Sequence, residues 1–405
     1  MTVPTIRRGI NRRELLAGGA AAGVLLATPS ILRAQEGLRI AIIRPLTGPL
    51  VSSFEGNFAS ASIAIDEINS KGGILGKQIV KYEVDDGGAP AQQPIAMRQV
   101  VQEGINIVVG PIGSSQTLAS LAVSTGSKII QSGYITANDG GNGSKYPYHY
   151  MCSIAVGMQA QLFVNFLKEK GAQKIGILVE DSAAGSATLD ALNEAIPAAG
   201  MTITASRVSP LRSADMTPFL RDLRNSGAEQ LIVFVSNTID TTQFFVGLQR
   251  LGWKPPVVGH AGLFFATFSD AVPADIKYED VYAATYKQLT FTDSEQPSER
   301  ISAYVDKILG VGLAPAALAP AATSPFYDFL SVVAHAANEV KSTESDALKE
   351  YLDQLSGFDG MFGPIGFTSE KHLGYDVSST ALAKVFPADS QLFKDSKGLF
   401  RPRAV

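Results

Sequence analysis

Downstream of residue 37, short runs rich in β-branched residues alternate with longer stretches in which apolar residues recur every three or four positions. The first pattern is typical of buried strands and the second of amphipathic helices. The predicted strands are 38–43, 79–84, 105–109, 174–179, 230–235 and 281–284. The predicted helices between them are 54–69, 92–103, 115–126, 158–170, 187–199, 217–225 and 241–251. This alternation predicts an α/β fold in which helices flank parallel-type sheets.

The alternation occurs twice, once before and once after residues 150–155. The chain has 405 residues, which is more than one hydrophobic core usually fills. We therefore predict two similar α/β lobes. Beyond residue 284 the order changes to helices at 299–309, 324–340 and 346–355, which we expect to cover the lobes.

Residues 1–34 have the pattern of an export signal, with an arginine-rich stretch followed by the uncharged, Ala/Gly-rich run 17–32. The sequence Asn-Arg-Arg-Glu-Leu-Leu at 11–16 resembles the twin-arginine motif, and an ordinary basic secretory signal is the alternative. We expect cleavage after Ala34. The segment carries five Arg and one Glu, so its removal makes the formal charge more negative than −4. Both alternatives predict a periplasmic protein that does not itself span the membrane.

Composition and motif searches exclude several function classes. A mildly acidic chain without a basic stripe does not match nucleic-acid binding. One cysteine, Cys152, excludes an intramolecular disulfide, and the four histidines lie far apart, so no metal or cofactor is expected. Zinc-protease, hydrolase-elbow, dinucleotide and EF-hand motifs do not occur. The adjacent carboxylates Glu180-Asp181 and Asp85-Asp86 are typical of capping and turns, because neighbours on a strand point to opposite faces. The expected protein is not an enzyme.

One motif indicates a binding site. The sequence Gly-Pro-Ile-Gly-Ser-Ser-Gln-Thr at 110–117 follows a hydrophobic strand and opens a helix, so backbone N–H groups and the hydroxyls of Ser114 and Ser115 converge there. This arrangement suits an anion such as a carboxylate, and simple helix capping by serine is the alternative. Residues 132–136 repeat the arrangement after the next strand, which favours a site.

Several motifs resemble the periplasmic leucine/isoleucine/valine-binding protein family, the solute-binding subunits of ABC importers. They are Pro-Leu-Thr-Gly-Pro at 45–49, Ala-Ile-Asp-Glu-Ile-Asn-Ser-Lys-Gly-Gly-Ile-Leu-Gly-Lys at 64–77, Val-Asp-Asp at 84–86, Phe-Asp-Gly at 358–360 and Gly-Pro-Ile-Gly-Phe at 363–367. The resemblance extends from about residue 38 to residue 374. It implies two Rossmann-like lobes joined by three crossing segments, with ligand bound in the cleft by hinge closure. The implied lobes are 38–153 plus 286–358, and 154–285 plus 359–405.

The resemblance also implies a ligand site and a partner, the ABC permease in the inner membrane. In amino-acid binders of this family, serine and threonine turns of the first lobe receive the ligand carboxylate. The matching positions in this sequence are Ser114, Ser115, Gly133, Tyr134 and Thr136. The aromatic position near the start of the first helix is matched by Phe54.

The second lobe departs from the family pattern. The glutamate that normally binds the ligand ammonium is replaced by Ala261, and the usual tyrosine is replaced by Ala184. A buried ammonium without a counter-charge is costly, so we expect a hydrophobic acid, for instance an aromatic or branched 2-oxo acid. Asn237 and Asp240 line the expected second-lobe side, and Asp240 is the residue that would restore amino-acid binding.

Three further points stay open at this stage. Phe264 and Phe265 are candidates either for apolar walls of the pocket or for the core. The family fold serves both import and the presentation of ligand to a membrane receptor or kinase, and neighbouring permease or kinase genes would distinguish the two. A periplasmic hydrolase on this fold would require turnover that depends on Ser114.

Overall fold

A computed structural model describes residues 37–48, 50–387 and 390–404. The predicted export signal, 1–34, lies outside these residues. The first sheet has four strands, β1 (Leu38–Arg44), β2 (Ile79–Asp85), β3 (Ile107–Ile112) and β4 (Ile130–Tyr134). Their order is β2-β1-β3-β4, and every pairing is parallel. The central strands are buried, as expected for a parallel sheet covered on both faces.

The second sheet has six strands. They are β5 (Lys174–Glu180), β6 (Thr202–Ser209), β7 (Gln230–Phe234), β8 (Val257–Gly259), β9 (Val281–Tyr286) and β13 (Thr380–Lys384). Their order is β13-β9-β8-β7-β5-β6. All pairings are parallel except that of β13 with β9, which is antiparallel. Four strands of two residues lie outside these sheets and form two pairs, β10 (Thr290–Phe291) with β14 (Arg401–Pro402) and β11 (Phe358–Asp359) with β12 (Pro364–Ile365).

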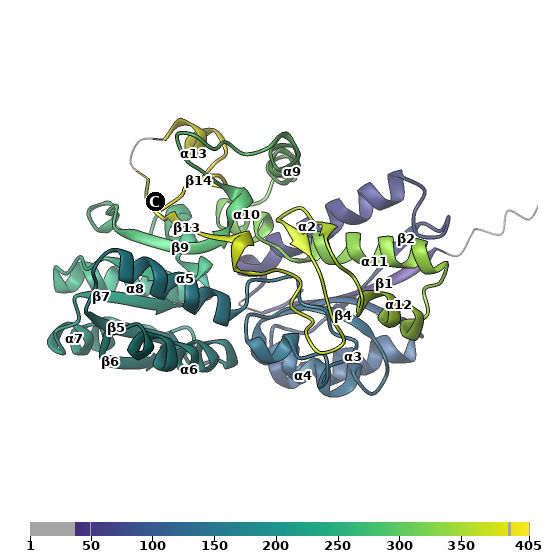
Figure 1. The fold of residues 1–405 in the computed structure, drawn as a ribbon, viewed down its shortest axis with the longest axis horizontal. Helices are drawn as coiled ribbons and strands as arrows, with labels where there is room; N and C mark the ends of the chain where they lie inside the picture. The colour runs from purple at the N-terminus through teal and green to yellow at the C-terminus, as the bar shows by residue number, and fades with distance from the viewer. Residues whose placement is uncertain (1–36, 49, 388–389, 405) are drawn as a thin grey trace, which may run out of the picture. The chain divides into compact units, whose positions relative to one another are not determined.

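Helices flank both sheets (Figure 1). In chain order they are α2 (Val51–Ser70), α3 (Gln93–Gln102), α4 (Ser114–Ser124), α5 (Val156–Glu169), α6 (Ala183–Ala198), α7 (Thr217–Asn225), α8 (Thr238–Leu251), α9 (Glu299–Gly310), α10 (Pro315–Ala322), α11 (Phe326–Val340), α12 (Ser345–Leu352) and α13 (Gln391–Asp395). Helices α10 and α11, late in the chain, pack on α2. The α/β class, the predicted strands and the predicted helices are thus confirmed.

Several elements have no predicted range, among them β4, β6, β8, β13, α10 and α13. Strand β6 is an edge strand with few fully buried residues, and β8 has only three residues. Helix α10 contains Pro320 in its interior, a residue that argues against a helix in a sequence pattern. Strand β13 lies in a region for which the alternation of strands and helices had already ended.

The hydrophobic core of the first sheet also takes in late segments of the chain. Phe326 and Phe329 of α11 belong to it, and so do Phe362 and Tyr375. The ring of Phe362 also stacks on that of Tyr286, the last residue of β9, with centroids 4.2 Å apart. Residues 361–375 therefore pack with the first sheet, and the chain joins the second sheet again at β13.

Candidate functional site

A cavity of about 350 Å³ lies where the loops that follow β3, β4, β5, β7 and β8 meet. These are the carboxyl ends of parallel strands, where open α/β folds bind ligands. Eight of the ten predicted site residues line it: Phe54, Ser114, Ser115, Tyr134, Thr136, Ala184, Asn237 and Ala261. Other lining residues, not predicted as ligand contacts, include Gln116, Glu180, Ser182, Arg212, Phe234, Ser236, His260, Phe264 and Phe265.

The N-terminus of α4 opens into this cavity. Gly113 precedes the helix with a φ of 104°, a left-handed conformation that favours glycine. The helical bonding pattern begins with the Thr117 N–H, which donates to the Gly113 carbonyl at 2.9 Å. The N–H groups of the first turn have no acceptor within the helix, and the helix dipole adds partial positive charge. This end of the cavity is therefore suited to an anion.

The serine hydroxyls of α4 are held in place by backbone groups. The Ser114 Oγ accepts the backbone N–H groups of Thr136 and Ala137, both at 3.2 Å. Because these donors occupy the lone pairs of Ser114, its own O–H remains to donate. The Ser115 Oγ accepts the N–H of Ala183, the first residue of α6, at 3.2 Å.

Gly133 does not line the cavity. A Cβ at this position would lie 2.4 Å from the Thr117 Oγ1, so glycine allows β4 and α4 to pack closely. The Gly133 N–H donates to the Nε2 of His149 at 3.1 Å, which directs it into the core. We interpret Gly133 as a residue that supports the wall of the site.

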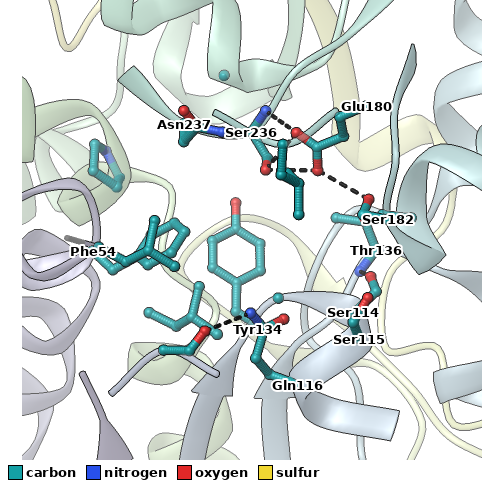
Figure 2. Close-up of a pocket in the computed structure, with 18 of the residues that line it drawn as sticks. Phe54, Ser114, Ser115, Gln116, Tyr134, Thr136, Glu180, Ser182, Ser236 and Asn237 are labelled. Atoms are coloured by element: carbon teal, nitrogen blue, oxygen red, sulfur yellow. Dashed lines mark hydrogen bonds between the residues drawn. The ribbon is translucent and has the colours of Figure 1, made fainter. Parts of the chain in front are cut away.

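Aromatic rings form much of the wall. Phe54 and Tyr134 come from α2 and β4, and Figure 2 shows the Tyr134 ring projecting among the lining residues. Burial raises the pKa of the Tyr134 phenol. Phe264 and Phe265 both line the cavity and are both buried, so each residue belongs to the pocket wall and to the core at the same time.

Phe264 is held in place by a buried cation. The Arg401 guanidinium carbon lies 4.0 Å from the Phe264 ring centroid, and the residue is 3% exposed. Arg401 donates to the carbonyl of Val385 at 3.0 Å and to the Thr267 Oγ1 at 3.3 Å. Burial lowers the pKa of Arg401 to about 9. The C-terminal segment thus supports the pocket wall.

Glu180 is the buried acid of the cavity. Its carboxylate oxygens accept the Ser236 N–H at 2.8 Å, the Ser236 O–H at 2.8 Å and the Ser182 O–H at 3.0 Å (Figure 2). The residue is 3% exposed, and burial raises its pKa to about 7, although the serine hydrogen bonds act in the opposite direction. The interpretation of Glu180 as a capping residue was wrong, since Glu180 points into the cavity while its neighbour Asp181 is exposed.

Asp240 lies outside the cavity lining. Its carboxylate accepts the backbone N–H groups of Arg212 at 3.0 Å and Ser213 at 2.8 Å, and it also accepts the Asn237 side-chain amide. Asn237 does line the cavity, and its Oδ1 caps α8 by accepting the Asp240 N–H at 2.9 Å. Because the Asp240 carboxylate is already used by the fold, we do not retain it as a substitute for the missing acid at Ala261.

His260 lies beside Ala261 on the cavity wall. Its ring lies at a tilt beside that of Phe234 with centroids 4.4 Å apart, and its Nδ1 accepts the Gly262 N–H at 3.0 Å. Burial lowers the pKa of His260 to about 4, so it is neutral at physiological pH. A Cβ on Gly262 would lie 1.9 Å from the Val235 carbonyl oxygen, so this turn requires glycine.

The described residues contain neither a group of metal ligands nor a membrane-spanning helix. In residues 37–48, 50–387 and 390–404, no group of three or more His, Cys, Asp or Glu side chains is placed to hold a metal ion. The helices within the same ranges are all too short or too polar to cross a bilayer. Cys152 is a buried free thiol whose pKa is raised by burial.

Comparison with known proteins identifies the family. Residues 37–385 match the family described as periplasmic binding protein. The chain belongs to this family. Its members are substrate-binding proteins rather than enzymes, and the resemblance drawn from the motifs is confirmed.

Individual relatives agree with this assignment. The Leu/Ile/Val-binding protein homolog 8 of Brucella suis biovar 1 (strain 1330) is 27% identical over 305 residues, which cover 71% of this chain and 74% of that protein. A solute-binding protein of an ABC transporter from Rhodopseudomonas palustris BisB5, solved with 3,4-dihydroxybenzoic acid, superposes with a TM-score of 0.71 at 18% identity and covers 86% of this chain and 93% of its own. LivJ from Streptococcus pneumoniae, solved with isoleucine, superposes with a TM-score of 0.72 at 21% identity and covers 86% and 96%. The fold is the type I periplasmic binding protein fold.

Proposed function

We propose that this chain is the extracytoplasmic solute-binding subunit of an ABC importer. Its ligand is a branched-chain amino acid or a related hydrophobic or aromatic carboxylate. The observation that carries the proposal is the N-terminus of α4, with Ser114 and Ser115, opening into a cavity walled by aromatic rings. Backbone N–H groups and hydroxyls bind a carboxylate, and the rings bury its apolar part. The ligands named for the Rhodopseudomonas and Streptococcus proteins both carry a carboxylate.

Capture occurs by closure of two lobes around the ligand. The lobes implied by the resemblance, 38–153 plus 286–358 and 154–285 plus 359–405, are proposed with one change to the third crossing. The packing of Phe362 and Tyr375 with the first sheet supports a third crossing that lies after residue 375 rather than at 358. A ligand that contacts both lobes favours the closed form because it binds that form more tightly.

The proposal includes export of the chain to the periplasm and delivery of the ligand to a membrane permease. Residues 1–34, with their twin-arginine-like sequence, direct the chain to the periplasm and are then cleaved. The mature protein delivers its ligand to permease subunits in the inner membrane. Replacement of Arg12 and Arg13 by lysine should cause precursor to accumulate in the cytoplasm, which cell fractionation would detect. A precursor that is processed normally would indicate an ordinary secretory signal instead.

The function is tested by thermal unfolding of the mature protein after denaturation and refolding have removed bound ligand. The panel contains aliphatic amino acids, 2-oxo acids and aromatic acids. A ligand at a hundredfold over its dissociation constant stabilises the native state by roughly 2.7 kcal/mol, which raises the midpoint by a few degrees. We expect a shift with at least one carboxylate of the panel. If no member shifts the midpoint, the proposed ligand class is wrong.

A further inference from the structure

The buried acid of the cavity has one open hydrogen-bonding position. A carboxylate offers about four lone-pair positions. Three donor hydrogens serve the Glu180 carboxylate: the Ser236 N–H, the Ser182 O–H, and the Ser236 O–H, whose oxygen lies 2.8 Å from both carboxylate oxygens and supplies one hydrogen to the two. The side chain lines the cavity and is 3% exposed, so a ligand in the cavity can reach the remaining position while bulk solvent has little access to it.

We propose that Glu180 forms a hydrogen bond with a hydroxyl group of the ligand, and that the preferred ligands are hydroxylated aromatic carboxylates. This inference rests on the proposed function, because the carboxylate of the same ligand lies at the N-terminus of α4. A flat ring between these two polar ends contacts the aromatic walls at Phe54 and Phe264.

A hydroxyl fits Glu180 better than an ammonium does. An ammonium brings three donors and needs several acceptors. Two neighbouring oxygen atoms already use one of their two lone pairs, since the Ser182 Oγ accepts the Gly185 N–H and the Asn237 Oδ1 accepts the Asp240 N–H. A hydroxyl needs a single acceptor for its own O–H, and its oxygen can accept a hydrogen bond from a protonated carboxyl group. It therefore pairs with Glu180 in either protonation state, which matters for a group whose pKa burial raises to about 7.

The experiment is isothermal titration of the refolded mature protein with benzoate, the three hydroxybenzoate isomers and leucine. We expect one hydroxybenzoate to bind at least about tenfold more tightly than benzoate, as for a buried hydrogen bond to a carboxyl group. In Glu180→Met, which keeps the side-chain length and removes both acceptors, this ratio should fall toward one. Because the readout is a ratio, a general weakening of binding does not imitate the result.

Two further variants control the experiment. Glu180→Gln keeps one acceptor and should retain part of the preference, and it replaces Glu180→Met if that variant does not refold. Glu229→Met changes an exposed glutamate that directly precedes β7 and pairs with Lys174 at 3.3 Å, and it should leave the ratio unchanged.

Three results would overturn the inference: an equal ratio in the wild type and Glu180→Met, no preference for any hydroxybenzoate over benzoate, or leucine binding that depends on Glu180 without hydroxybenzoate binding. Each of these leaves the proposed function standing if some carboxylate binds. If no acid in the wider panel binds, both the proposed function and the role of Glu180 are wrong.

Discussion

The hydroxyl oxygen of Ser115 and the backbone nitrogen of Ala183 lie 3.2 Å apart, joined by a hydrogen bond. Ser115 belongs to the first turn of α4, beside the first sheet, and Ala183 begins α6, beside the second. The same serine lines the cavity. One side chain thus connects ligand recognition with the contact between two helices of different sheets.

Replacement of Ser115 by alanine removes this bond and one donor to the ligand. We expect ligand affinity to fall about fivefold or more, since a neutral hydrogen bond contributes about 1 kcal/mol. Calorimetric titration with a ligand from the panel measures the change. Ser124→Ala is a matched control on the same helix, because Ser124 is buried and its Oγ has no partner among the described residues. Equal affinities for the two variants would contradict the role of Ser115.

Stability should depend on pH through His149. Its Nδ1 lies 2.7 Å from the Gly140 carbonyl oxygen, and its Nε2 accepts the Gly133 N–H. Protonation of Nε2 would therefore place its N–H against the N–H of Gly133. Burial lowers the His149 pKa to about 4 from 6.5. The unfolded chain therefore binds more protons between pH 4 and 6.5, and stability rises with pH across that window.

Urea unfolding at pH 5 and pH 7 tests this prediction. The loss of stability at pH 5 should be smaller in His149→Gln than in the wild type, by an amount on the order of 2 kcal/mol. His335→Gln, which changes a half-buried histidine that contacts Tyr351, is the control.

Glu180 should affect the pH dependence of stability with the opposite sign. Its pKa in the folded chain is about 7, so the folded chain holds more protons than the unfolded chain between pH 4.5 and 7. Glu180→Gln should therefore show a steeper rise of stability with pH than the wild type.

Arg401 should be more important for stability than its position near the C-terminus suggests. Arg401→Lys loses the planar guanidinium that reaches the Val385 carbonyl and stacks on Phe264. We expect a loss of about 2 kcal/mol or more in the free energy of unfolding, because buried acceptors are left without donors. Arg207→Lys, at a partly exposed ion pair with Asp222, should cost less than about 1 kcal/mol. Comparable losses would show that Arg401 has no special structural role.

Much of the fold was predictable because hydrophobic periodicity reports burial directly. The central strands of the first sheet, β1 and β3, are buried on both faces and give continuous apolar runs, as in 107–109. The missed strand β6 is only partly buried, so its sequence has no strong pattern. The pairing of β13 with β9 joins residues about a hundred positions apart, and local periodicity contains no information about it.

The site was predictable where a local motif determines it and not where tertiary contacts do. The serine turn at α4 follows from a strand, a glycine and two serines in succession. The alternation of side chains along a strand correctly separates Glu180 from Asp181. That rule does not indicate that one of the two faces is a ligand cavity. The hydrogen bonds of Asp240 with Arg212 and Ser213 likewise depend on a loop whose two residues lie 28 and 27 positions away in the sequence.

The antiparallel strand β13 closes one edge of the second sheet and is supplied by residues 380–384, close to the end of the chain. During synthesis on the ribosome, β9 is made long before its partner and leaves its edge unpaired. Unpaired edges of this kind attract other strands and promote aggregation. We therefore expect the second sheet to reach its final form only after residues 380–384 have left the ribosome, so a chain truncated before residue 380 should be a target for chaperones and proteases rather than a smaller version of the protein.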